Sequence, residues 1–202
     1  MSRTNCQAGT ITLASSSRGN VSIKVPGLGA AAQLYSVPGH CVLFALQPHA
    51  YAITRYRIEG ECLTRHEHVV VDARHPVHIN GAHELFEQTS DGQENAGVIA
   101  SFNFPDKTAD IQVFDRSTLQ KTGWFPADDS AARFLTCLEL LEGVADPHTF
   151  QVAEELIYHY HPGVAWKAFQ QIHHASPNRA QQYVRMLGKH HNPRLNTLLE
   201  RI

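Results

Sequence analysis

Residues 60–84, "GECLTRHEHVVVDARHPVHINGAHE", contain a cluster of five histidines: His66, His68, His75, His78 and His83. Imidazole nitrogens bind Zn²⁺ and Fe²⁺ when two or more of them converge on one point. On a β-strand, residues i and i+2 point to the same face, so His66 and His68 are predicted to project together. The segment therefore predicts either a metal site or a strand region with partly exposed histidines.

The composition of the chain limits the classes of protein to which it can belong. Its 202 residues are enough for one large or two small domains, and 43% hydrophobic residues is an ordinary content for a globular protein. A formal net charge of −2 excludes a strong overall attraction to nucleic acid or to acidic membranes. No signal-peptide core, membrane-length apolar run or CxxC motif is found, so we expect a cytoplasmic protein with reduced thiols and no membrane contact.

The first part of the chain, from residue 9 to about residue 124, has the pattern of short strands. Seven segments rich in β-branched and aromatic residues are separated by Gly, Pro, Asn or Asp. They read "GTITL", "NVSIKV", "CVLFAL", "YAITRYRI", "CLTRHEHVVV", "AGVIASFNF" and "ADIQVFD". Strands at this spacing, with no helical pattern between them, predict an antiparallel β-sandwich or barrel.

The fourth and fifth segments are predicted to form one hairpin with Glu59 and Gly60 as its turn residues. In that register Ile53 faces His66 and Tyr51 faces His68 across the two strands. We predict that the face with His66 and His68 lines the cavity of the barrel, where Arg55 could bind an anionic ligand. The predicted ligand-binding residues are Tyr51, Ile53, Arg55, His66 and His68.

The spacing Gly60-x5-His66-x-His68-x3-Asp72 resembles the opening of the first cupin motif, in which Glu stands at the place of Asp72. The resemblance implies a cupin-like barrel, a tendency to form homodimers, and a metal site made by His66, His68 and Asp72. Because "GVIASFNFPDKTADIQ" has no histidine, a fourth ligand would come from the loop with His75, His78 or His83. The main expectation is that no cofactor is bound, and a divalent Fe, Mn, Zn or Ni ion is the alternative.

After Asp128 the apolar residues follow a helical period. Phe134, Cys137, Leu138 and Leu141 form one apolar stripe, and Asp128 or Asp129 can cap the helix. Four further helices are predicted to begin at prolines spaced by 15 or 16 residues: Pro147, Pro162, Pro177 and Pro193.

The helix after Pro162 is predicted to lie at the centre of a helical core. We expect Ala168, Phe169 and Ile172 to be buried there, whereas Gln170 and Gln171 should tolerate alanine. "HPGVAWKAFQQI" and "NPRLNTLLERI" resemble the second helices of HEAT-like repeats. The prediction is therefore an α+β protein with a cupin-like β-domain, residues 1–125, and a HEAT-like repeat of about five helices, residues 126–202.

Three functions are compatible with these features. The first is a non-catalytic binding or regulatory protein, whose barrel holds a small molecule or serves assembly and whose helices contact a partner or a second copy. The second is a metal-dependent cupin enzyme. The third is a transcriptional regulator, because residues 163–202 carry six Lys or Arg against one Glu and "KAFQQIHHASPNRAQQYVRM" resembles part of AraC-type regulators. We favour the first, with no catalytic residue and with nucleic acid not expected as a partner.

Overall fold

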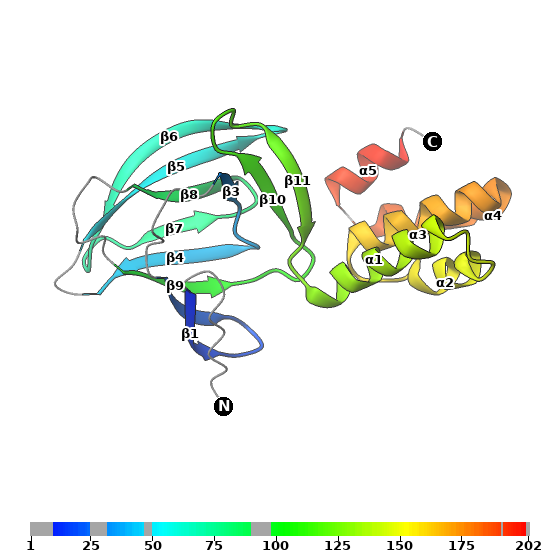
Figure 1. Cartoon of the computed structure of the whole chain (residues 1–202), viewed down its shortest axis with the longest axis horizontal. Coiled ribbons are helices and arrows are strands. Elements are labelled where there is room, and N and C mark those ends of the chain that lie inside the picture. The colour runs from blue at the N-terminus through cyan, green and yellow to red at the C-terminus, as the bar shows by residue number, and fades with distance from the viewer. Residues whose placement is uncertain (1–9, 25–31, 47–49, 90–97, 191, 201–202) are drawn as a thin grey trace. The chain divides into compact units, whose positions relative to one another are not determined.

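The computed structural model describes residues 10–24, 32–46, 50–89, 98–190 and 192–200. The protein is α+β, with all its described strands in the first part of the chain and its helices in the second (Figure 1). Two compact units result, Met1–Phe125 and Pro126–Ile202. Positions 9, 25 and 96–97 of the predicted strands and Arg201 of the basic segment lie outside the described residues.

The strands lie in three antiparallel sheets. All seven predicted strands are present, and four were not predicted: β3, β7, β8 and β11. The bounds are β1 Thr10–Ser15, β2 Asn20–Lys24, β3 Gln33–Tyr35, β4 His40–Ala45, β5 Tyr51–Glu59, β6 Cys62–Val71, β7 Val77–Asn80, β8 Glu84–Thr89, β9 Ile99–Phe104, β10 Asp110–Asp115 and β11 Lys121–Pro126. The sheet orders are β1-β2-β9-β4-β7, β11-β10-β3 and β6-β5-β8, and in the described residues none of them closes into a barrel.

Two apolar clusters hold these sheets together. The β4–β5 core joins the five-stranded sheet to the β6-β5-β8 sheet and contains Cys41, Leu43, Ala45, Tyr51, Ile53, Val71, Ile79 and Ile99. The β5–β10 core contains Leu34, Tyr56, Leu63, Leu85 and Phe114. Strand β5 contributes to both clusters, because Ile53 and Tyr56 lie on its opposite faces. The β6-β5-β8 sheet is therefore fixed from both sides, which makes it a stable support for side chains at its ends.

A β-bulge interrupts the hairpin of β5 and β6. Arg55 pairs with Glu67, but the next residue, Tyr56, pairs with Arg65, so His66 is the extra residue. The bulge reverses the alternation of side chains along β6. This explains why Leu63 packs in the β5–β10 core while Val71, eight residues later, packs in the β4–β5 core.

The predicted register of this hairpin was wrong by two residues near the turn and by three residues beyond the bulge. Glu59 pairs with Cys62, so Gly60 and Glu61 form the turn, and Gly60 has a φ of +64° that suits glycine. Ile53 therefore faces Val69 instead of His66, and Tyr51 faces Val71 instead of His68. Local sequence could not fix this register, because both possible turns contain Gly60.

The second unit contains five α-helices and one short 3-10 helix within the described residues. They are α1 Asp129–Gly143, α2 Thr149–Leu156, α3 Pro162–Ala175, α4 Pro177–Leu187, η1 Gly188–His190 and α5 Pro193–Leu199. Pro162, Pro177 and Pro193 open helices as predicted, whereas Pro147 lies two residues before α2. No described helix is both long and apolar enough to span a membrane.

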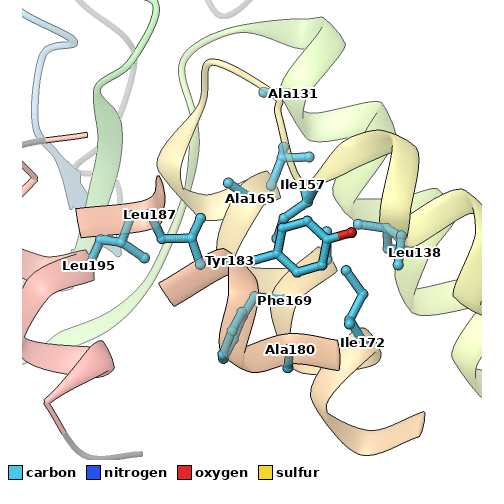
Figure 2. Close-up of a cluster of buried hydrophobic side chains, with 13 residues drawn as sticks. Ala131, Leu138, Ile157, Ala165, Phe169, Ile172, Ala180, Tyr183, Leu187 and Leu195 are labelled. Atoms are coloured by element: carbon cyan, nitrogen blue, oxygen red, sulfur yellow. The ribbon is translucent and has the colours of Figure 1, made fainter. Parts of the chain in front are cut away.

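The helices enclose one buried apolar cluster, to which side chains from α1 to α5 contribute (Figure 2). Ala168, Phe169 and Ile172 are buried there as predicted, and Phe169 is only 1% exposed. Helix α1 differs from its predicted stripe. It buries Leu138 together with Ala131, whereas Phe134 and Cys137 are exposed.

The expected tolerance of Gln171 to alanine is not supported by its surroundings. Gln171 is buried, and its Nε2 donates to the Leu138 carbonyl oxygen at 3.1 Å and to Glu142 Oε2 at 3.2 Å. Removing the amide would leave the buried carbonyl without this donor, which is costly. Gln170 is exposed, as expected.

Asp128 caps α1 and gives a testable dependence of stability on pH. Its carboxylate accepts hydrogen bonds from the Ser130 hydroxyl at 2.6 Å, the Tyr160 hydroxyl at 2.6 Å and the Ser130 backbone N–H at 2.8 Å. The Ser130 hydroxyl first, and then the Tyr160 hydroxyl, holds the pKa of Asp128 well below its usual range. The folded state is therefore favoured when Asp128 is ionised.

We predict that Asp128→Ala lowers the free energy of unfolding by about 1 kcal/mol at pH 7, the usual loss for an N-cap. The difference from the unchanged protein should shrink below about pH 4, because there the unfolded state takes up the proton before the folded state does. Urea unfolding at pH 7 and at pH 3 measures both values. Asp129→Ala is the matched control, since Asp129 follows directly and is exposed. An equal loss at the two pH values would contradict the assigned role of the carboxylate.

Candidate functional site

The candidate site is a pocket at one end of the β6-β5-β8 sheet. Alternate residues of β5 share a face, which carries Tyr51, Ile53, Arg55 and Arg57 in sequence. The first two belong to the β4–β5 core, and the last two line a pocket of about 450 Å³. Its complete lining is Arg55, Tyr56, Arg57, Ile58, His66, Asn80, His83 and Glu84. The volume is in the range for a small-molecule site.

Two irregular backbone features bring side chains to this pocket. The bulge in β6 places His66 beside Arg55 at its wall. The turn between β7 and β8, residues 81–83, supplies His83. The residues on either side of this turn, Asn80 and Glu84, also line the pocket. This turn is held by backbone hydrogen bonds from Gly81 N to Gly39 O at 2.8 Å and from Ile58 N to His83 O at 2.7 Å.

The guanidinium of Arg55 is held between two carboxylates, and the three side chains together carry a formal charge of −1. The guanidinium forms ion pairs with Glu67, which lies opposite it on β6, and with Glu84 on β8. The Arg55 Nε also donates to Glu84 Oε2 at 3.2 Å, and Glu84 Oε1 accepts from the Asn80 backbone N–H at 2.9 Å. The side chains of Arg55 and Glu84 are 21% and 17% exposed, so this pair is partly screened from water. The network fixes the shape of the pocket wall. The charge of Arg55 is engaged by Glu67 and Glu84 and is not free to bind a ligand.

Arg57 differs from Arg55 in its surroundings. It is exposed, lies two residues further along the same strand face, and forms no ion pair within the part of the chain that the structure describes, although Glu84 stands opposite it on β8. His66 and His83, both exposed, line the same pocket. The pocket therefore offers a guanidinium that forms no ion pair among the described residues, and two imidazoles, groups that donate hydrogen bonds to carboxylates and phosphates.

The other predicted ligand-binding residues lie elsewhere. Tyr51 and Ile53 are buried in the β4–β5 core next to the pocket but do not line it. Burial first, and then the neighbouring Cys41, raises the pKa of Tyr51. Its phenol therefore stays protonated and donates to the Phe44 carbonyl oxygen at 3.3 Å. Burial likewise raises the pKa of the Cys41 thiol to about 12, which makes it a poor nucleophile.

The prediction that His66 and His68 share a face lining the cavity was wrong. His68 pairs with Thr54 and therefore lies on the face opposite to Arg55, whereas His66 lines the pocket with Arg55. The bulge between them is the physical reason, since it shifts the alternation of side chains by one residue. Both imidazoles are exposed.

The predicted metal ligands are not brought together as a group. Asp72 accepts hydrogen bonds from the His75 backbone N–H at 2.8 Å and the Arg74 backbone N–H at 2.7 Å, and it contacts His75 Nδ1 at 2.9 Å. These hydrogen bonds, led by the His75 side chain, lower the pKa of Asp72. Among the described residues, no group of three or more His, Cys, Asp or Glu side chains has the geometry to hold a metal ion.

Two basic residues of the helical unit are paired within that unit. Lys167 Nζ lies 2.6 Å from Glu142 Oε2, and Arg179 lies 3.4 Å from Glu154 Oε1. The Arg179 guanidinium also lies 5.0 Å from the centre of the Phe150 ring. These contacts reduce the charge that this segment offers to nucleic acid.

Six of the eight pocket residues were not among the predicted ligand-binding residues: Tyr56, Arg57, Ile58, Asn80, His83 and Glu84. Arg57 could have been found, because it follows Arg55 by two residues on a predicted strand. Asn80 and Glu84 belong to β7 and β8, which were not predicted. A scan against protein-family models and a search of curated proteins each found no match for the chain.

Proposed function

We propose that the protein is a non-catalytic binding protein whose pocket at Arg57 takes a small molecule with a carboxylate or phosphate group. The observation that carries the proposal is the guanidinium of Arg57, which lines a pocket of about 450 Å³ and forms no ion pair among the described residues. Arg55 is held by Glu67 and Glu84 at the wall of the pocket, so the arginine that is left to attract an anion is Arg57. His66 and His83 supply further hydrogen-bond donors to its oxygens.

The test of this proposal compares alanine variants of two arginines on the same hairpin. Arg57→Ala should weaken the binding of inorganic phosphate or succinate about 10- to 100-fold, because a hydrogen bond between charged groups contributes roughly 1.5–3 kcal/mol. Arg65→Ala is the matched control: it removes the same charge from an exposed strand residue that lies outside the pocket lining. Isothermal titration calorimetry measures both dissociation constants.

Equal weakening in the two variants would contradict the site, because a general charge effect would then explain the binding. If neither phosphate nor succinate binds to the unchanged protein, the proposed site is also contradicted. The measurement should be repeated at two salt concentrations, since screening weakens an exposed guanidinium more than a buried one.

Assembly is a second part of the proposal. We propose self-association as a homodimer, and contact with a protein partner through the helical unit, as the cupin-like and HEAT-like resemblances imply. The five-stranded sheet has exposed apolar side chains that such association could cover, among them Leu13, Phe102 and Phe104. Analytical ultracentrifugation of the full chain measures the self-association directly.

A further inference from the structure

A second pair of histidines lies on the five-stranded sheet and does not line the Arg57 pocket. His40 pairs with Asn80 across β4 and β7, and His78 stands two residues before Asn80, so both imidazoles project from the same face. Nδ1 of His40 lies 3.1 Å from Nε2 of His78. The ring centres are 5.2 Å apart with an angle of 18° between the planes, and both side chains are exposed.

This separation is the one that two ligands of a single metal ion adopt. Nitrogen ligands lie about 2.0–2.1 Å from Zn²⁺. When the N–metal–N angle lies between the square-planar and the tetrahedral value, two such nitrogens are roughly 2.9–3.4 Å apart. The same distance also fits an N–H···N hydrogen bond between the rings. An ion can replace that hydrogen bond without loss of a proton, because each neutral imidazole can carry its proton on the other nitrogen.

The backbone around the pair is well fixed. Cys41 and Ile79, the residues next to the two histidines, are only 1% and 0% exposed and belong to the β4–β5 core. Strand β4 is also paired with β9 on its other side. The two rings therefore need only rotate about their side-chain bonds to bring both nitrogens toward one ion, and little of the binding energy is lost in ordering the backbone.

We propose that His40 and His78 form a two-histidine site for a divalent ion of the late first transition series, such as Cu²⁺, Ni²⁺ or Zn²⁺. Water molecules would complete the coordination shell, because the site lies on the surface. Cu²⁺ should bind most tightly of the three, following the usual order of stability for nitrogen ligands. The ion would tether β7, an edge strand of its sheet, to β4. The site does not depend on the anion pocket.

The test is titration of tag-free full-length protein with Zn²⁺ and with Cu²⁺. His40→Gln and His78→Gln should each weaken the tightest binding event at least 10-fold, and the double variant should add little, because either change breaks the chelate. His68→Gln is the matched control, since His68 is exposed on a strand that does not belong to this sheet.

A second readout is the midpoint of thermal unfolding. Saturating Zn²⁺ should raise it by about 2–5 °C in the unchanged protein and in His68→Gln, but not in the two site variants. If Zn²⁺ and Cu²⁺ bind no more tightly to the unchanged protein than to His40→Gln, the site does not exist. Loss of binding in His68→Gln would also overturn it. Unfolding midpoints without metal show whether each variant is folded.

Discussion

Phe169→Ala is expected to lower the free energy of unfolding of the helical unit by about 3–5 kcal/mol, the usual loss for a buried aromatic side chain. Phe169 lies in the middle of α3, is 1% exposed, and belongs to the apolar cluster shared by all five helices. Its ring stacks on Trp166, with 5.6 Å between the ring centres, and on His173 at 6.0 Å. Alanine would leave a cavity that these neighbours could fill only in part.

The measurement is chemical unfolding of the full chain followed by circular dichroism at 222 nm, which reports mainly on the helices. Phe134→Ala is the matched control, because Phe134 is 38% exposed on α1 and packs edge-to-face on His159. We expect it to cost less than about 1 kcal/mol. A loss for Phe169→Ala as small as that for Phe134→Ala would contradict the assignment of Phe169 to the centre of the core.

The helices were predicted accurately because their signals are local. Asp128 and Asn192 cap α1 and α5 with side-chain hydrogen bonds, and Pro162 opens α3, all within a few residues of the chain. The prediction of which helix face is buried was less accurate. Phe134 fits the apolar period of α1 as well as Leu138 does, but only the packing of the other helices decides which of the two is covered.

The site was predicted only in part because it depends on two features that local periodicity does not encode. The first is the bulge at His66, which separates this residue from His68. The second is the turn between β7 and β8, which brings His83 to the pocket from a segment with few β-branched residues. Arg55 and His66 are the two predicted residues that line the pocket: Arg55 was named from its place on the hairpin and His66 from the His-x-His spacing.

Gly81 is the residue on which this turn depends most. It lies directly after β7 and is buried, and its N–H donates to the Gly39 carbonyl oxygen. A Cβ atom at this position would stand 1.8 Å from the Val37 carbonyl oxygen and 2.8 Å from the Val37 carbonyl carbon. Since both are backbone atoms, a change of side-chain rotamer cannot relieve the clash, and one of the two segments must move.

Gly81→Ala is therefore expected to lower the free energy of unfolding of the β-unit by about 3 kcal/mol, the upper part of the range for overpacking. Because the turn carries His83 and joins Asn80 to Glu84, the binding of phosphate or succinate to the Arg57 pocket should weaken in the same variant. Gly123→Ala is the matched control: nothing lies within 4 Å of its added Cβ, and alanine in a strand should be neutral or stabilise by about 0.5 kcal/mol.

Urea unfolding followed by tryptophan fluorescence in a Trp166→Phe background reports on this unit through Trp124, because the chain's other tryptophan lies in the helical unit. Calorimetry reports on the pocket. The two readouts separate the effects of the substitution. A stable Gly81→Ala protein with weakened anion binding would mean that the β7–β8 turn has moved to relieve the clash, and the pocket with it. If the variant is as stable as Gly123→Ala and binds the anion unchanged, the close approach of Gly81 to Val37 does not shape the site.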